Sequence, residues 1–203
     1  MGRVAKFDRD AAVEICMNEM WRYGYEACSV KSISEKLGIT RSSFYNAFGS
    51  REALFLEVVE RYVDQLPHKS LRPASESTPI KRLLTDFFRE VCHNITADPE
   101  ARGCLGINSI AELVGNDESL GPVVEGALLR SVQRFEDILE AAVAKGEIED
   151  DGQLHQKALS LQNLAAGLSL MSKVVRSKED LIAVAEQTLK GMDLYEDVPA
   201  AMN

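Results

Sequence analysis

Hydrophobic residues in the N-terminal third of the chain recur three and four positions apart, the spacing that puts them on one face of an α-helix. The pattern predicts four short helices, separated at Gly24, Gly38 and Gly49-Ser50. Their apolar positions are Val13, Cys16, Met17 and Met20 in the first, Val30, Ile33 and Leu37 in the second, Phe44 and Phe48 in the third, and Leu54, Phe55, Val58, Val59 and Tyr62 in the fourth. Thr40 is the expected N-cap of the third helix, and Ser50 that of a fourth helix running from Arg51 to about Gln65.

The same spacing continues in the rest of the chain and predicts five more helices. They cover 79 to about 95, about 104–114, from near 117 or 122 to 145, about 153–175, and about 178–192. Thr78 is the expected N-cap of the first of these, with Pro79 in the first helical position. Ser177 and Asp180 resemble a capping box before the last. Because no segment alternates with a period of two, the sequence predicts an all-α fold.

Residues 66–79 interrupt this periodicity with three prolines and several serines, which is typical of a linker or loop. They separate a compact N-terminal helical unit from a longer one. We therefore expect one domain over residues 1–50 and another over residues 51–203, with the helix at 51–66 connecting the two.

Charge is distributed unevenly along the chain. The net charge of −9 argues, taken alone, against a nucleic-acid partner. Residues 1–66 nevertheless carry nine Lys or Arg and ten Asp or Glu, so their net charge is only −1, while the remainder carries −8. Any contacts with phosphate must come from local basic groups in the first 66 residues.

Several other classes of protein receive no support from the sequence. The first ten residues lack the apolar core of a signal peptide, and the longest uncharged stretch, residues 158–172, is too short for a membrane span, so we expect a cytoplasmic protein without a membrane partner. The four cysteines and three histidines have no ligand-like spacing, so neither a metal site, a disulfide framework nor a cofactor is predicted.

Residues 30–48 have the dimensions of a helix-turn-helix: two short helices joined by the tight turn Gly38-Ile39-Thr40. Apolar contacts from Ile33, Leu37, Ile39 and Phe44 would fix the angle between the helices. The residues left on the outer face of the second helix are Arg41, Ser42, Ser43, Tyr45 and Asn46. These short or flat donors and acceptors suit base edges and phosphates in a major groove.

The segment from Gly24 to Phe55 resembles the DNA-binding region of TetR-family transcriptional regulators. The elements that carry the resemblance are Gly24-Tyr25, Val30-x-x-Ile33, Leu37-Gly38-Ile39, Phe44-Tyr45-x-x-Phe48 and Ser50-Arg51-Glu52-x-Leu54. The likeness spans about residues 8–62 and is specific, because five separated elements agree in order and spacing. In the C-terminal part it extends only to helical character and length.

The resemblance implies a set of DNA contacts. Thr40, Arg41, Ser42 and Ser43 would approach bases and nearby phosphates, with Asn46 beside them. Tyr45 would contact the backbone through its hydroxyl. Arg51 would pair with a phosphate at the N-terminus of the fourth helix, and Ser29 and Lys31 would touch the opposite strand. The sequence departs from the family at Asn46-Ala47, where bulkier residues are common, and at Ser34, where alanine is common.

The resemblance also predicts how the C-terminal half works. Its last two helices, with the small-residue stretch 161–171, would form a homodimer interface, and two recognition helices would then meet a near-palindromic operator. A cavity between the helices would bind an unidentified small molecule that releases the DNA. The candidate lining residues are Phe88, Cys92, Cys104, Ile107, Asn108, Phe135, Leu168 and Met171. Each of them also fits a place in the helical core.

The function predicted is that of a DNA-binding transcriptional regulator, most simply a ligand-released repressor. Cys104 leaves one alternative open, since a thiol next to Arg102 at a helix N-terminus could be a sensor of oxidants or electrophiles or a plain structural residue. A helical enzyme that uses Cys104 as nucleophile is disfavoured, because no histidine has a suggestive spacing to it. A carrier of small molecules without DNA binding is disfavoured by the polar face of residues 41–46.

Overall fold

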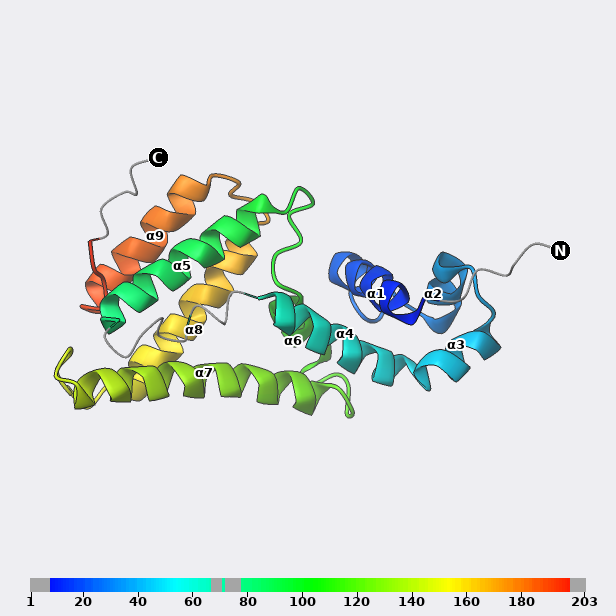
Figure 1. Cartoon of the computed structure of the whole chain (residues 1–203), viewed down its shortest axis with the longest axis horizontal. Helices are drawn as coiled ribbons and strands as arrows, with labels where there is room; N and C mark the ends of the chain where they lie inside the picture. Colours follow the sequence, from blue (N-terminus) through cyan, green and yellow to red (C-terminus); the bar gives the residue numbers. More distant parts are fainter. Residues whose placement is uncertain (1–7, 67–70, 72–77, 198–203) are drawn as a thin grey trace. The chain divides into compact units, whose positions relative to one another are not determined.

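The structure is a computed structural model that describes residues 8–66, 71 and 78–197. Within these ranges the chain forms α-helices joined by short turns, and no β-strand occurs (Figure 1). The helices are α1 (Arg9–Tyr23), α2 (Val30–Leu37), α3 (Arg41–Phe48), α4 (Arg51–Gln65), α5 (Ile80–Ala97), α6 (Leu105–Leu113), α7 (Gly121–Ala144), α8 (Leu154–Met171) and α9 (Lys178–Gly191). The all-α prediction is confirmed. Most of the predicted linker, 67–70 and 72–77, lies outside the described residues.

Two helix ends differ from the prediction. Pro79 and not Thr78 is the N-cap of α5, and the free backbone amide of Ile80 is satisfied by the carboxylate of Glu147 instead. Helix α8 ends at Met171, four residues earlier than expected. The hydroxyl of Ser172 there donates to the carbonyl of Ser169 at 2.8 Å, and tight turns replace the helical pattern up to Val175.

The described residues divide into two compact units. One holds residues up to 65 together with 108–124, and the other holds 66–107 together with 125 onwards. Helix α4 and the segment 108–124 therefore belong with the N-terminal unit, whereas the sequence placed the boundary after residue 50. The division into a DNA-binding part and a regulatory part stays a prediction.

Helices α1 and α4 form the base of the N-terminal unit. Val13, Phe44, Leu54 and Val58 are fully buried in it. Two ion pairs join α1 to α4 at its edge: Arg9 donates to Glu57 at 2.7 Å, and Arg61 donates to Asp10 at 3.0 Å. Because these pairs are largely exposed, they fix the relative position of the two helices more than they stabilise the fold.

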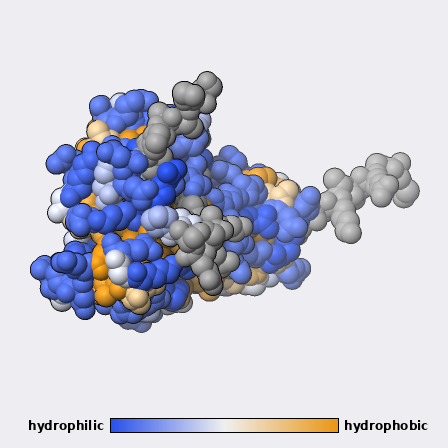
Figure 2. Space-filling view, turned by 60° about the vertical axis from the view of Figure 1, so that its left-hand side comes forward, coloured by the Kyte–Doolittle hydropathy of each residue, from blue (hydrophilic) through white to orange (hydrophobic). Residues whose placement is uncertain are grey.

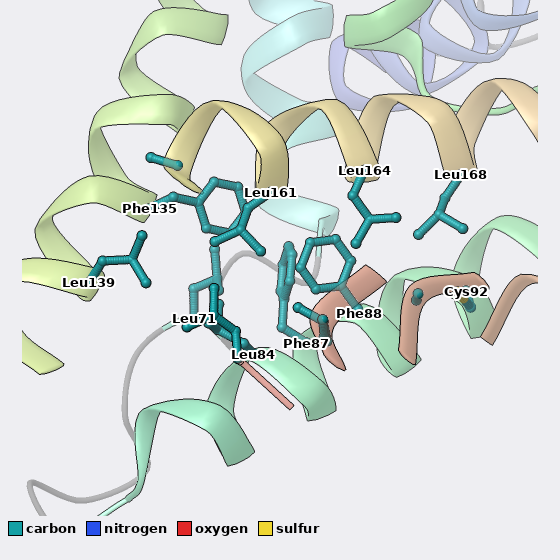
Figure 3. Packing of buried hydrophobic residues seen from close by; sticks show 14 of the residues in the cluster. Leu71, Leu84, Phe87, Phe88, Cys92, Phe135, Leu139, Leu161, Leu164 and Leu168 are labelled. Atoms are coloured by element: carbon teal, nitrogen blue, oxygen red, sulfur yellow. The ribbon is translucent and has the colours of Figure 1, made fainter. Parts of the chain in front are cut away.

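The second unit is built around a cluster of aromatic and aliphatic side chains. Helix α5 packs against α8 and α9 (Figure 1). The rings of Phe88 on α5 and Phe135 on α7 lie parallel with centroids 6.3 Å apart, and Phe87 meets both edge-on. Figure 3 shows leucines of α8 closing over the Phe88 ring. This packing leaves the centre of the unit filled by side chains.

One buried group in the N-terminal unit is unfavourable. Ser34 of α2 is 3% exposed, and its hydroxyl has no hydrogen-bond partner. A buried hydroxyl without a partner has lost its hydration and gained nothing in exchange. The replacement of a common alanine by serine at this position therefore has a cost in stability.

We predict that Ser34→Ala raises the free energy of unfolding by about 1 kcal/mol, measured by chemical denaturation. Ser42→Ala is the matched control, because Ser42 is an exposed helical serine and gains the same helix propensity without removing a buried hydroxyl. Equal stability changes for the two substitutions would contradict the account of Ser34.

Candidate DNA-binding site

The turn between α2 and α3 is set by Gly38, which lies in the left-handed region at φ 66° and ψ 31°. Its amide donates to the carbonyl of Glu35 at 3.2 Å, and that of Ile39 donates to the carbonyl of Ser34 at 3.0 Å. This pair of bonds closes the end of α2. Thr40 then starts α3 at once, since its hydroxyl accepts the backbone amide of Ser43 at 3.1 Å.

The orientation of α3 follows from two of its aromatic residues. Phe44 is fully buried and Phe48 is 5% exposed, with ring centroids 5.2 Å apart. The five predicted contact residues of α3 all lie on its exposed side: Arg41, Ser42, Ser43, Tyr45 and Asn46. Tyr45 is 52% exposed, although it stands next to a buried ring. The structure therefore brings the predicted recognition residues together on one accessible face.

Three of the predicted contact residues also have structural roles. Ser29 is the N-cap of α2 and accepts the amide of Ser32 at 3.1 Å, and Thr40 caps α3 in the same way. The hydroxyls of Thr40 and Ser43 are 2.9 Å apart. A capping oxygen still has capacity for a second hydrogen bond. These residues can contact DNA while they hold the helix ends that present their neighbours.

The two cationic candidates outside α3, Lys31 and Arg51, differ in the exposure of their side chains and in their contacts with acidic residues. The Lys31 side chain is 67% exposed and is only 4.0 Å from Glu35, a weak surface pair. Arg51 begins α4 with its side chain only 23% exposed. Its guanidinium lies 4.0 Å above the ring of Tyr25 and donates to Glu26 at 3.2 Å. A phosphate at this position would have to share Arg51 with Glu26.

Comparison with known proteins agrees with this geometry. The family model for the N-terminal domain of bacterial regulatory proteins of the TetR family matches residues 13–58, and the model for a tetracycline-repressor-like C-terminal domain matches residues 79–188. The second match alone covers more than half of the chain. The chain belongs to the TetR family.

Relatives and solved structures are similar over almost the whole length. The transcriptional repressor ComR of Escherichia coli is 27% identical over 190 residues, 93% of this chain and 90% of its own. The uncharacterised regulator YezE of Bacillus subtilis is 27% identical over 195 residues, 95% and 100%. The TetR-family regulator CifR, solved as a cysteine mutant with operator DNA, is 27% identical with a TM-score of 0.82, covering 93% of this chain and 98% of CifR. As a TetR-family member, the chain is a DNA-binding transcriptional regulator.

The predicted effector-binding residues of this TetR-family chain are dispersed in the structure. Phe88, Cys92, Phe135 and Leu168 are at most 2% exposed and belong to the packed core of the second unit (Figure 3). Leu168 also lines, with Met171, a groove between α8 and α9. Ile107 and Asn108 are half-buried on α6. The role of these residues in binding an effector stays a prediction.

Cys104 differs from the other three cysteines. Burial raises the pKa of the Cys16 thiol to about 12 and the pKa values of the Cys28 and Cys92 thiols to about 11, so these three stay protonated at neutral pH. Cys104 is partly exposed directly before α6.

Among the described residues no group of His, Cys, Asp and Glu could hold a metal ion, and no described helix is long and apolar enough to cross a bilayer.

Sequence reasoning missed the residue that binds the turn between α1 and α2. The amides of Tyr25 and Glu26 are bound by Glu112, 87 and 86 residues further along the chain. No local spacing indicates a contact over that separation. The sequence predicts a helix end at Gly24, and the structure shows that the absence of a Cβ there also makes room for this carboxylate.

We predict that Gly38→Ala lowers the free energy of unfolding by about 1 kcal/mol, since alanine is strained at a positive φ while nothing within 4 Å obstructs its Cβ. Gly38→Asn should recover part of the loss, because asparagine tolerates this region. The control is Gly106→Ala within α6, where alanine should not destabilise. Equal stability of Gly38→Ala and the wild type in denaturant titration would contradict this description of the turn.

Proposed function

We propose that this chain is a ligand-released repressor that binds a near-palindromic operator as a homodimer. The observation that carries the proposal is the exposed polar face of α3, held outward by the burial of Phe44 and Phe48. Two relatives support it by name: ComR is a repressor, and CifR was solved with double-strand operator DNA. The contacts proposed for this chain are those of Ser29, Lys31, Thr40, Arg41, Ser42, Ser43, Tyr45, Asn46 and Arg51.

Arg41 is the strongest candidate for reading a base. It occupies the first position of α3, is exposed, and has no acidic residue of α3 beside it. An arginine at the start of a recognition helix can make a bidentate contact with guanine in the major groove. Tyr45, one turn further along and 52% exposed, is placed to reach a phosphate with its hydroxyl.

The homodimer is supported by an apolar groove between α8 and α9. It has a volume of about 640 Å³ and is lined from both helices, at positions one helical turn apart. Met171 and Val184 in its walls are 47% and 52% exposed, and a Cβ on Gly167 would meet no side chain of another residue within 4 Å. Figure 2 shows apolar groups gathered in patches on an otherwise hydrophilic surface. We assign a second copy of this chain as the occupant of the groove.

The release mechanism is a shift between two states of the dimer. An effector bound in the C-terminal part would move α4, which changes the spacing of the two recognition helices and lowers operator affinity. Only an effector with different affinity for the two states can produce this shift. Phe88, Cys92, Cys104, Ile107, Asn108, Phe135 and Leu168 are the residues proposed to surround it, and an effector would have to displace the side chains that fill the core at Phe88, Cys92, Phe135 and Leu168. Met171 also lines the groove assigned to the second copy of the chain.

The test of DNA binding uses a duplex selected from a random-sequence library by the wild-type protein. Arg41→Ala combined with Tyr45→Ala should weaken binding by about 100-fold or more, since each of the two protomers loses a bidentate base contact worth about 1–3 kcal/mol and a phosphate contact as well. Wild-type affinity should also fall with salt, with a slope near −0.9 for each phosphate neutralised. Fluorescence anisotropy at several salt concentrations measures both effects.

Arg130→Ala is the control for this experiment, because it removes the same charge from an exposed position on α7, outside the proposed contacts. It should leave the salt slope unchanged. DNA binding through α3 is wrong if the double variant binds as tightly as the wild type, or if wild-type binding is insensitive to salt.

For the dimer, we predict that Val184→Glu converts the protein to a monomer at micromolar concentration, because each copy would bury a carboxylate in an apolar interface. Sedimentation velocity measures the result. Leu129→Glu on α7 is the matched control, since Leu129 is 56% exposed and does not line the groove. An unchanged dimer with Val184→Glu would exclude the α8–α9 face as the interface.

A further inference from the structure

A carboxylate from α6 binds the turn that precedes α2. The two oxygens of Glu112 accept the backbone amides of Tyr25 at 3.0 Å and of Glu26 at 2.7 Å. All of these residues belong to the same compact unit. Successive backbone amides that point at one anion form a small binding site for it, here occupied by a side chain of the same molecule.

Gly24 is required for this contact in two ways. Its φ of 85° is in the region that favours glycine. A Cβ on this residue would also lie 2.8 Å from a Glu112 oxygen, closer than atoms pack. The chain therefore turns at Gly24 in a conformation that both exposes the next two amides and lets the carboxylate approach them.

The turn that Glu112 holds carries the two side chains that position Arg51. The Tyr25 ring is buried, and its centroid is 5.0 Å from the centroid of the Phe55 ring. The Arg51 guanidinium lies over the face of the Tyr25 ring. The Glu26 carboxylate accepts a hydrogen bond from Arg51 at 3.2 Å. Both contacts that hold the guanidinium at the start of α4 thus come from the two residues whose amides bind Glu112.

We propose that Glu112 is a positioning residue for operator binding: by fixing the backbone of residues 24–26 it places Tyr25 and Glu26, and through them the guanidinium that meets a DNA phosphate. This inference rests on the proposed operator binding and adds a residue remote in sequence to it. Without Glu112 the turn gains freedom, and Arg51 loses its fixed direction.

The experiment compares operator affinity and its salt dependence in full-length variants, with the duplex selected by the wild-type protein as probe. Glu112→Ala should weaken binding about 100-fold, since each of the two protomers loses the value of one hydrogen bond to a charged group, about tenfold. Its salt slope should become shallower by about 1.8, as for Arg51→Ala, because each protomer of the dimer loses one phosphate contact worth about 0.9. In the Arg51→Ala background, Glu112→Ala should change affinity by less than about twofold.

Two further variants separate positioning from folding. Glu118→Ala removes the same charge from an exposed position of the same segment and should bind like the wild type. Gly24→Ala breaks the contact from the other side and should reproduce the shallower salt slope. Thermal unfolding of each variant shows that it is folded at the temperature of the binding measurement.

The outcomes are distinct. Wild-type affinity and salt slope in Glu112→Ala, whatever its melting temperature, would overturn the inference and leave Glu112 a structural residue. Weakened binding that adds fully to the effect of Arg51→Ala would overturn the route through Arg51. If the wild-type protein selects no duplex from the library, operator binding itself fails, and the inference fails with it.

Discussion

The burial of Phe44 and Phe48 is the constraint on which the N-terminal unit depends. With both rings in the core, α3 has only one rotational setting about its axis, and its polar residues must lie on the outer face. The left-handed conformation of Gly38 complements this constraint, since it lets α3 begin with only three residues between it and the end of α2. The predicted contact residues are thus placed by residues whose own side chains are buried or absent.

The second unit follows a different principle. Its interior is filled by stacked phenylalanines from α5 and α7 and leucines from α8, whereas α8 and α9 leave apolar side chains on the outside. A contiguous apolar patch that a single chain leaves exposed is typical of a surface that another molecule covers. The pairing of a closed core with an open apolar face is what the proposed twofold dimer requires.

The local features of the fold could be predicted from the sequence because short-range rules determine them. Helical spacing, the glycine turn at Gly38 and the cap at Thr40 predict α1 to α4, with the ends of α1 and α2, the start of α3 and both ends of α4 where the structure has them. The end of α8 could not be predicted, because it depends on the Ser172 hydroxyl, which donates to the carbonyl of Ser169. The start of α5 could not be predicted either, because its first amide is bound by the carboxylate of Glu147, which is distant in the sequence. For the same reason the contact of Glu112 with the turn after Gly24 left no trace in the sequence pattern.

In the proposed dimer, two α3 helices read a DNA site with twofold symmetry. Selection of binding sequences from random DNA by the full-length protein tests it most directly. The proposed dimer should enrich a near-palindromic motif whose half-sites are centred about one turn of DNA, about 34–36 Å, or a multiple of one turn apart. Recovery of no common motif, or of a motif without twofold symmetry, would contradict it.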